Sequence, residues 1–262
     1  SEIGEDQNTE VENKDNSQFI DMSLAKDIEA YFQENGIDHE KVAYCITDLE
    51  HNIKYSMNEK DEFIAASIYK LPLAMLYYDK INEGEYTLDS TFTYSGYMHE
   101  GAGVISSNYG IGSQVPLSDL LNDLIIYSDN DAGHILYENL GGWKEYKEAM
   151  TKYTDSISEN YYTMDNVTTA NTMNDVVTYL YDHKEDYKVL IKNMEKAEPG
   201  EYLDRDTQLS MPQKYGMYDY ALNSVGFVEC NTSYSIVVLT SLGDKGADVM
   251  ANINRIAYEH FK

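Results

Sequence analysis

Basic residues and proline are scarce in this 262-residue chain. Lysine and arginine together number 19, against 46 aspartates and glutamates, which gives a net charge of −27. Such a chain repels phosphate groups, and no basic stripe offsets the charge, so nucleic acid is excluded as a partner and an anionic membrane surface is unfavourable. No apolar run approaches the roughly 18 residues of a membrane-spanning helix, so we expect no span. With only 4 prolines and 42% hydrophobic residues, the composition predicts a folded globule of one domain or two interleaved lobes.

Cysteine is also rare, whereas tyrosine is abundant. Cys45 and Cys230 allow at most one disulfide and do not have the spacing of a metal site, so we expect free thiols or a weakly supported bridge. Tyrosine accounts for 25 of the aromatic residues, beside 6 phenylalanines and 1 tryptophan. Because the ring is apolar and the hydroxyl needs a partner, many tyrosines are expected to be half-buried or to line clefts.

The N-terminal residues have almost no apolar side chains. Residues 1–17 contain six acids and one lysine, so they bury too little surface to offset the entropy of ordering. The sequence predicts a flexible acidic leader over residues 1–19. A tether behind a removed signal or lipid-anchor sequence is one natural origin for such a segment.

Hydrophobic periodicity separates a sheet, built from both ends of the chain, from a helical middle. Helical patterns cover 23–35, 67–82, 117–127, 129–140, 143–152, 170–183, 185–194 and 247–261. Strand patterns cover 41–49, 53–58, 211–218, 223–230 and 233–241. This order predicts an α+β fold, with an antiparallel five-stranded sheet flanked by the N- and C-terminal helices and with an inserted all-helical lobe.

The predicted domain covers residues 20–262, and the expected site is the cleft between its two lobes. The α/β lobe is assigned to about 20–62 and 205–262, and the helical lobe to about 63–204. Catalytic groups usually gather in such a cleft.

Ser67 and Lys70 begin a strongly apolar helical pattern. Residues three apart share one helix face, so the amine can reach the hydroxyl. A desolvated lysine with a lowered pKa can take the proton of a serine nucleophile. Alone, the pair is equally compatible with a helix-capping serine and a solvated lysine.

Two more short motifs follow. Ser128, Asp129 and Asn130 stand between two helical patterns, where they can face a cleft or simply cap a helix. Lys214, Tyr215 and Gly216 open the late strands. There the lysine can attract an anion and the glycine can leave room for a ligand, although an edge lysine beside a strand glycine is common.

Together, Ser-x-x-Lys, Ser-Asp-Asn and a Lys-Tyr-Gly element in this order resemble class A serine β-lactamases and penicillin-binding proteins. The third element departs from the family's Lys-Thr-Gly at Tyr215. The resemblance covers residues 20–262 and implies acyl-enzyme chemistry, with Ser67 as nucleophile and Lys70 as general base. Ser128 would relay a proton to the leaving nitrogen, and Lys214 would orient Ser128 and attract a substrate carboxylate.

The resemblance also implies the substrate contacts. Asn130 would hold the substrate's side-chain amide, and the N–H groups of Ser67 and Met217 would form the oxyanion hole. Tyr215 and Gly216 would border the substrate on the late strand. The family needs no metal or organic cofactor, so none is expected, and the partner would be a small β-lactam or peptidoglycan-like molecule. A monomer is expected, secreted or anchored outside the cytoplasmic membrane of a bacterium.

Two departures bear on activity. Class A enzymes carry a glutamate and an asparagine in a long loop, but residues 153–169 form a shorter segment without such an element, and its acids are Asp155, Glu159 and Asp165. Residues 217–227 contain no arginine to hold a substrate carboxylate. We therefore expect acylation of Ser67 by β-lactams with slow hydrolysis. A D,D-peptidase, another acyl hydrolase, or a penicillin-binding sensor without turnover are the alternatives.

Overall fold

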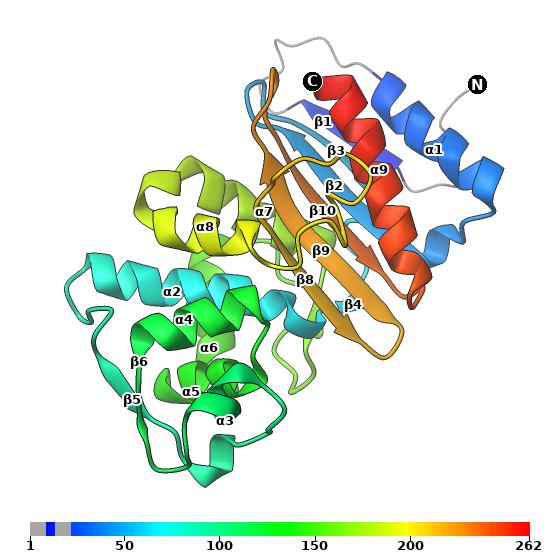
Figure 1. Cartoon of the computed structure of the whole chain (residues 1–262). Helices are drawn as coiled ribbons and strands as arrows, with labels where there is room; N and C mark the ends of the chain where they lie inside the picture. Colours follow the sequence, from blue (N-terminus) through cyan, green and yellow to red (C-terminus); the bar gives the residue numbers. More distant parts are fainter. Residues whose placement is uncertain (1–8, 14–21) are drawn as a thin grey trace.

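The computed structural model describes residues 9–13 and 22–262, and their main sheet has six antiparallel strands (Figure 1). The strand order is β1-β3-β2-β10-β9-β8. The strands are β1 Thr9–Asn13, β2 Val42–Asp48, β3 Ile53–Met57, β8 Gln213–Tyr218, β9 Ala221–Val228 and β10 Tyr234–Thr240. The α+β fold and its antiparallel sheet are thus confirmed, with one strand more than predicted.

The additional strand, β1, falls inside the predicted leader, so the expectation of a flexible segment is wrong for these five residues. Thr9 pairs with Met57 and Asn13 with Ile53, which satisfies the otherwise open edge of β3. Val11 is the only apolar residue of β1 and packs against the core. One apolar residue gives no alternating pattern, which is why the sequence did not predict the strand. Residues 1–8 and 14–19 of the leader lie outside the described residues.

Two terminal helices, α1 Ser23–Asn35 and α9 Lys245–Phe261, cover one face of the sheet (Figure 1). Leu24, Ile28 and Phe32 of α1 share a core cluster with Val249 and Ile253 of α9. The chain leaves α1 through Gly36, whose φ of 60° is in the left-handed region that glycine adopts without steric cost. Both terminal helices were predicted from their periodicity, and α1 has the predicted bounds.

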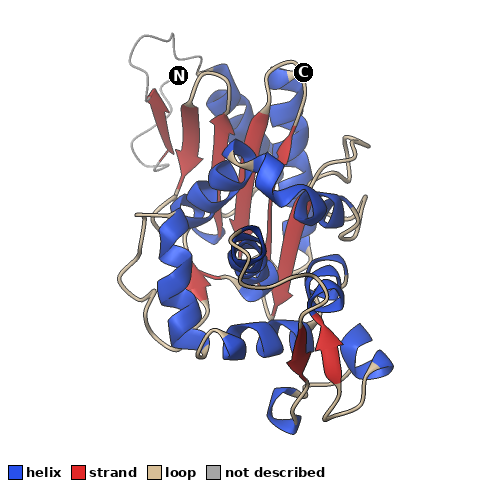
Figure 2. Cartoon of the chain, turned by 90° about the vertical axis from the view of Figure 1, so that its left-hand side faces the viewer, coloured by secondary structure: helices blue, strands red, loops and turns tan. Residues whose placement is uncertain are grey.

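The helical lobe surrounds α2 Lys70–Asn82, which is buried from Lys70 through Tyr78. A helix that is apolar on all sides needs neighbours on all sides. Its neighbours are α4 Leu117–Ile126, α5 Asn130–Asn139 and α6 Trp143–Met150, and α8 Lys188–Glu195 packs in turn on α4. Another helix, α7 Ala170–Asp182, packs on β10, β2 and β9, on the sheet face opposite the terminal helices (Figures 1 and 2).

The middle of the chain was predicted to be all-helical, but it also contains two short strand pairs. Besides a further helix, α3 Val104–Asn108, it has a two-stranded sheet of β5 Thr91–Thr93 and β6 Gln114–Pro116, and a second pair formed by β4 Phe63–Ile64 and β7 Val167–Thr168. Strands of two or three residues are too short for a periodic pattern. The β4–β7 pair joins the residues just before Ser67 to the end of the loop at 153–167.

Both cysteines are free thiols. Cys45 lies on β2 and Cys230 follows β9, with β10 between these two strands. Many tyrosines, such as Tyr69, Tyr109 and Tyr137, are half-buried as expected, and others lie in the core. Eleven tyrosines are core residues: 31, 44, 55, 77, 78, 94, 146, 153, 161, 187 and 234. In residues 9–13 and 22–262, no helix is long and apolar enough to cross a membrane.

Candidate active site

Ser67 and Lys70 lie in direct hydrogen-bond contact. Ser67 belongs to a 3-10 turn, Ala66–Tyr69, that runs into α2, so the two residues keep the predicted common face. The Lys70 amine lies 3.1 Å from the Ser67 hydroxyl, 3.2 Å from the Ser128 hydroxyl and 2.8 Å from Asn130 Oδ1. A fourth contact, of 2.7 Å, joins it to the Ser128 carbonyl. The first two motifs therefore meet at one amine.

Burial prepares Lys70 to accept a proton. Its side chain is fully buried, and this desolvation lowers the pKa of Lys70 from 10.5 to about 8, against the opposing effect of the Asp129 and Glu100 carboxylates. At pH values near this pKa a substantial fraction of the amine is neutral. Only the neutral amine can take the proton of Ser67.

The Ser-Asp-Asn turn serves as a helix cap and as part of the site. Asp129 begins α5, and its carboxylate accepts hydrogen bonds from the Ala132 and Ile105 amides. Ser128 has a φ of 53°, a left-handed conformation that is rare outside glycine. The cap fixes this turn so that Ser128 and Asn130 both reach Lys70. The two interpretations of the motif are therefore compatible.

Lys214 approaches the same hydroxyl from the sheet. Its amine lies 3.0 Å from Ser128 Oγ and 2.6 Å from its neighbour's carbonyl at Tyr215. Burial, followed by repulsion from Lys70, holds the pKa of Lys214 well below its usual range. The Ser128 hydroxyl thus lies within hydrogen-bond distance of two amines.

The three residues after Lys214 differ in their contacts. Met217 lines the pocket as expected. Tyr215 does not, because its ring stacks on Tyr202 at 4.5 Å between centroids and lies under the Lys214 amine. Gly216 is required for a reason other than the ligand contact expected: a Cβ there would stand 2.6 Å from the Ser67 nitrogen. This glycine lets β8 approach the nucleophile's backbone.

Two asparagines that sequence reasoning missed hold the residues just before Ser67. Asn223 of β9 donates from its side chain to the carbonyls of Ile64 and Ala65, each at 2.9 Å. Asn166 donates to the carbonyl of Ala66 at 2.8 Å, and its own carbonyl accepts from the Ala65 amide at 2.9 Å. Single asparagines outside a motif give no sequence signal, because these contacts span 100 residues or more.

These bonds stabilise a strained residue. Ala66 has a φ of 53°, which costs an L-residue on the order of 1–2 kcal/mol. Such conformations persist where the surroundings fix them, and they cluster at functional sites. Hydrogen bonds from the sheet and from the loop therefore set the position of Ser67.

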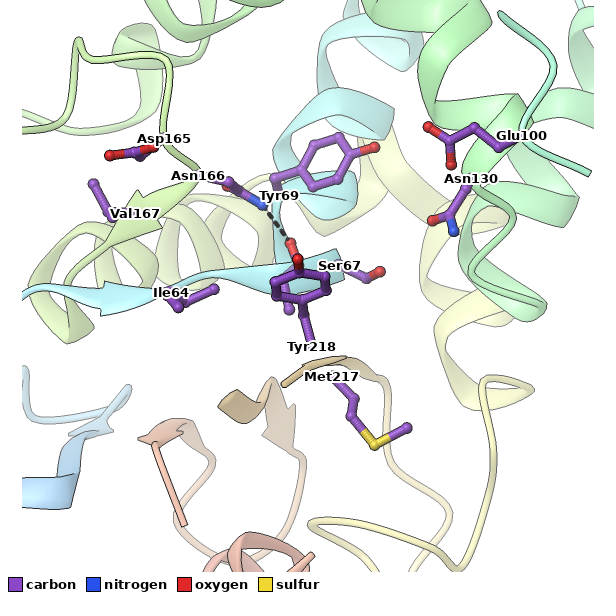
Figure 3. A pocket seen from close by; sticks show the side chains of 11 residues that line it. Ile64, Ser67, Tyr69, Glu100, Asn130, Asp165, Asn166, Val167, Met217 and Tyr218 are labelled. Carbon is purple, nitrogen blue, oxygen red and sulfur yellow. Dashed lines mark hydrogen bonds between the residues drawn. The ribbon is translucent and has the colours of Figure 1, made fainter. Parts of the chain in front are cut away.

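A cavity of about 690 Å³ opens beside Ser67 (Figure 3). Its lining residues are Ile64, Ala66, Ser67, Tyr69, Glu100, Asn130, Asp165, Asn166, Val167, Met217 and Tyr218. Two carboxylates and no basic side chain are among them, because Lys70 and Lys214 are buried behind the wall. Glu100 and Tyr218, like Asn166, were not predicted.

The loop before β7 offers three acids, and their positions differ. Asp165 lines the cavity, on the side of Asn166 and Val167 (Figure 3). Asp155 lines separate clefts beside α7, and Glu159 is exposed. Asp165 is therefore the loop acid nearest to the chemistry, and Figure 3 places its carboxylate apart from the Ser67 side chain.

The fold and the serine–lysine pair define a class of proteins, the active-site serine hydrolases of the β-lactamase type. The model of the Beta-lactamase enzyme family matches residues 23–261, so the chain belongs to this family. No curated protein matches it.

Solved structures with the same fold have low sequence identity to this chain. A β-lactamase from Chitinophaga pinensis shares 20% identity at a TM-score of 0.76, covering 92% of this chain and 100% of that one. A β-lactamase from Sphaerobacter thermophilus shares 20% at a TM-score of 0.75, covering 92% and 98%. A PBP-A variant, solved as an acyl-enzyme complex with penicillin G, shares 15% at a TM-score of 0.76, covering 92% and 96%.

Proposed function

We propose that this protein is an acyl-enzyme serine hydrolase that reacts with β-lactams at Ser67 and releases the product slowly. The observation that carries the proposal is the convergence of Lys70 and Lys214 on the hydroxyls of Ser67 and Ser128. A serine hydroxyl next to a desolvated amine is an activated nucleophile. The proposed residues are those predicted from the motifs.

Acylation needs one proton relay. Neutral Lys70 takes the proton of Ser67 as its Oγ attacks the β-lactam carbonyl, and the N–H groups of Ser67 and Met217 stabilise the oxyanion. The carbonyl then re-forms, the C–N bond breaks, and Ser128 gives its proton to the leaving nitrogen. Lys70 returns its proton to Ser128, so the amine ends neutral and the ester remains on Ser67. Asn130, which lines the cavity, is proposed to hold the substrate's side-chain amide.

Hydrolysis of the ester needs a base that activates water, and the loop at 153–169 supplies none of the family's usual form. Loss of a general base costs about 10² to 10⁴ in rate. The ester on Ser67 is therefore expected to persist. A D,D-peptidase acting on peptidoglycan-like peptides, or a penicillin-binding sensor, is the second candidate, favoured by the same loop. Both substrates lie outside the cytoplasmic membrane, which is where we place the protein.

Intact mass spectrometry after addition of penicillin G tests the proposal. We expect the mass to rise by one penicillin and to decay slowly, with no rise in Ser67→Ala and a normal rise in Ser107→Ala, a control on the exposed side of α3. Release of D-alanine from a D-alanyl-D-alanine peptide would indicate the peptidase. An adduct that forms unchanged in Ser67→Ala would refute the assignment of the nucleophile.

A further inference from the structure

A buried lysine, Lys147, lies close to the cavity and takes no part in the proposed chemistry. It projects from α6 and is only 2% exposed. Its amine also lies 5.4 Å from the centre of the Trp143 ring and 5.1 Å from that of Tyr161. Taking an ammonium group out of water is costly unless other groups solvate it, so its partners indicate its role.

The partners of Lys147 are backbone carbonyls of the loop that lacks the family's base. The amine donates to the carbonyls of Tyr161 at 2.5 Å, Thr163 at 2.9 Å and Asp165 at 2.5 Å. In return, the Tyr161 hydroxyl donates to the Lys147 carbonyl at 2.8 Å. Three alternate residues, 161, 163 and 165, thus bind one cation. No ion pair to a carboxylate is found for Lys147 within residues 9–13 and 22–262.

The loop continues directly into the nucleophile's support. Asn166 follows Asp165 and makes the two hydrogen bonds to Ala65 and Ala66 described above. Figure 3 shows this asparagine side chain directed toward the turn that carries Ser67. A continuous path therefore runs from the Lys147 ammonium through the loop backbone to the strained residue before Ser67.

We propose that Lys147 is a positioning residue that fixes the loop at 161–166 and, through Asn166, the backbone of Ser67. The expected effect on the acylation rate rests on the proposed function, whereas the expected effect on the order of the backbone around Ser67 does not. An apolar side chain of similar length could fill the same space but could not bind the three carbonyls, and the buried carbonyl of Tyr161 would lose this partner. The cation thus adds to the order that side chains of the loop supply, such as the bonds of Ser158 and Asn160 to Glu62.

The test compares Lys147→Met with Lys144→Met, which removes an exposed lysine from the same helix. Two quantities are measured in the folded proteins: the acylation rate constant with penicillin G, by intact mass, and amide hydrogen exchange. Lys147→Met is expected to acylate about 10²-fold more slowly, because small displacements of reacting groups cost rates of that order. Exchange should accelerate at residues 160–168 and 64–68 and stay unchanged in β9 and β10. Lys144→Met should match the unmodified protein.

Asn166→Ala separates positioning from a general loss of stability. It should slow acylation and accelerate exchange at 64–68, while 160–164 remain protected by Lys147. If Lys147 acts through Asn166, the double variant should acylate no more slowly than the slower single variant. Additive losses would overturn the proposal, as would wild-type acylation, or unchanged exchange at 64–68, in folded Lys147→Met.

Two further results remain informative. If Lys147→Met does not fold, Lys147→Gln keeps two N–H donors, and the same exchange pattern is expected from it in a milder form. If the unmodified protein forms no adduct, the proposed function fails, but exchange at 64–68 in the Lys147 variants still decides whether this residue positions Ser67.

Discussion

The two sides of the cavity are held in place by different kinds of contact. On the side of α2, α5 and β8, side chains that can exchange protons touch one another: Ser67, Lys70, Ser128 and Lys214. On the loop side, Lys147 binds backbone carbonyls, which cannot accept or release protons near neutral pH. In the proposed function the first side carries out acylation, whereas the second supports the backbone of Ser67 through Asn166.

This contrast separates bond formation at Ser67 from release of the product. A fold of the β-lactamase type with an intact serine–lysine network need not be an efficient β-lactamase, because the two half-reactions depend on different segments.

Removal of the base should have the largest effect. Lys70→Met keeps much of the side-chain volume but cannot accept the Ser67 proton, so the acylation rate constant should fall by about 10² to 10⁴. The rate is measured by intact mass with penicillin G. Lys80→Met, at the far end of the same helix, is the control and should leave it unchanged. Normal acylation of Lys70→Met would show that Lys70 is not the base that takes the Ser67 proton.

The pH dependence of acylation should report the same amine. Since the pKa of Lys70 is lowered to about 8 and the neutral form is reactive, the rate should rise with pH and level off above that value. Between about pH 6 and about pH 8 the neutral fraction grows from about one hundredth to one half, a rise of about fifty-fold. A rate that is flat over this range would exclude Lys70 as the base.

Gly216→Ala should disturb the contact between β8 and the nucleophile's turn. The new Cβ would meet the nitrogens of Ser67 and Ile68 at 2.6 and 2.8 Å, both of them backbone atoms that cannot move alone. Overpacking of this kind costs about 1–3 kcal/mol, which urea unfolding measures, and acylation should slow with it. Gly96→Ala is the control, because its Cβ would meet only the Ile111 side chain at 3.8 Å. Equal stability of the two variants would contradict the close approach.

The smallest expected effect comes from charge. Glu100 and Asp165 line the cavity of a protein with a net charge of −27, so anionic β-lactams should be captured slowly and faster in added salt. Penicillins that differ only in a neutral, amino or carboxyl substituent on the benzyl group should acylate in the order amino, neutral, carboxyl. Glu100→Gln should narrow these differences several-fold. If the rate differences among the three penicillins are as large in Glu100→Gln as in the unmodified protein, Glu100 does not have this role.

The motif residues could be predicted from sequence because their chemistry depends on residue types in a fixed order. Ser67, Lys70, Ser128 and Lys214 meet as the motifs implied. Lys147, Asn166 and Asn223 could not be predicted, because their partners are backbone groups far along the chain. The main helices and strands followed from periodicity. In contrast, β1 and the two short strand pairs depend on edges supplied by the rest of the fold.

The most direct test of the central claim is a single-turnover experiment with penicillin G that resolves formation and decay of the Ser67 adduct in the same sample. We expect decay to be slower than formation by about 10² or more, which is the rate that a general base for water would contribute. We also expect equal decay in Asp165→Asn, because that carboxylate stands apart from Ser67. Hydrolysis as fast as acylation, abolished by Asp165→Asn, would contradict the account and identify Asp165 as the missing base.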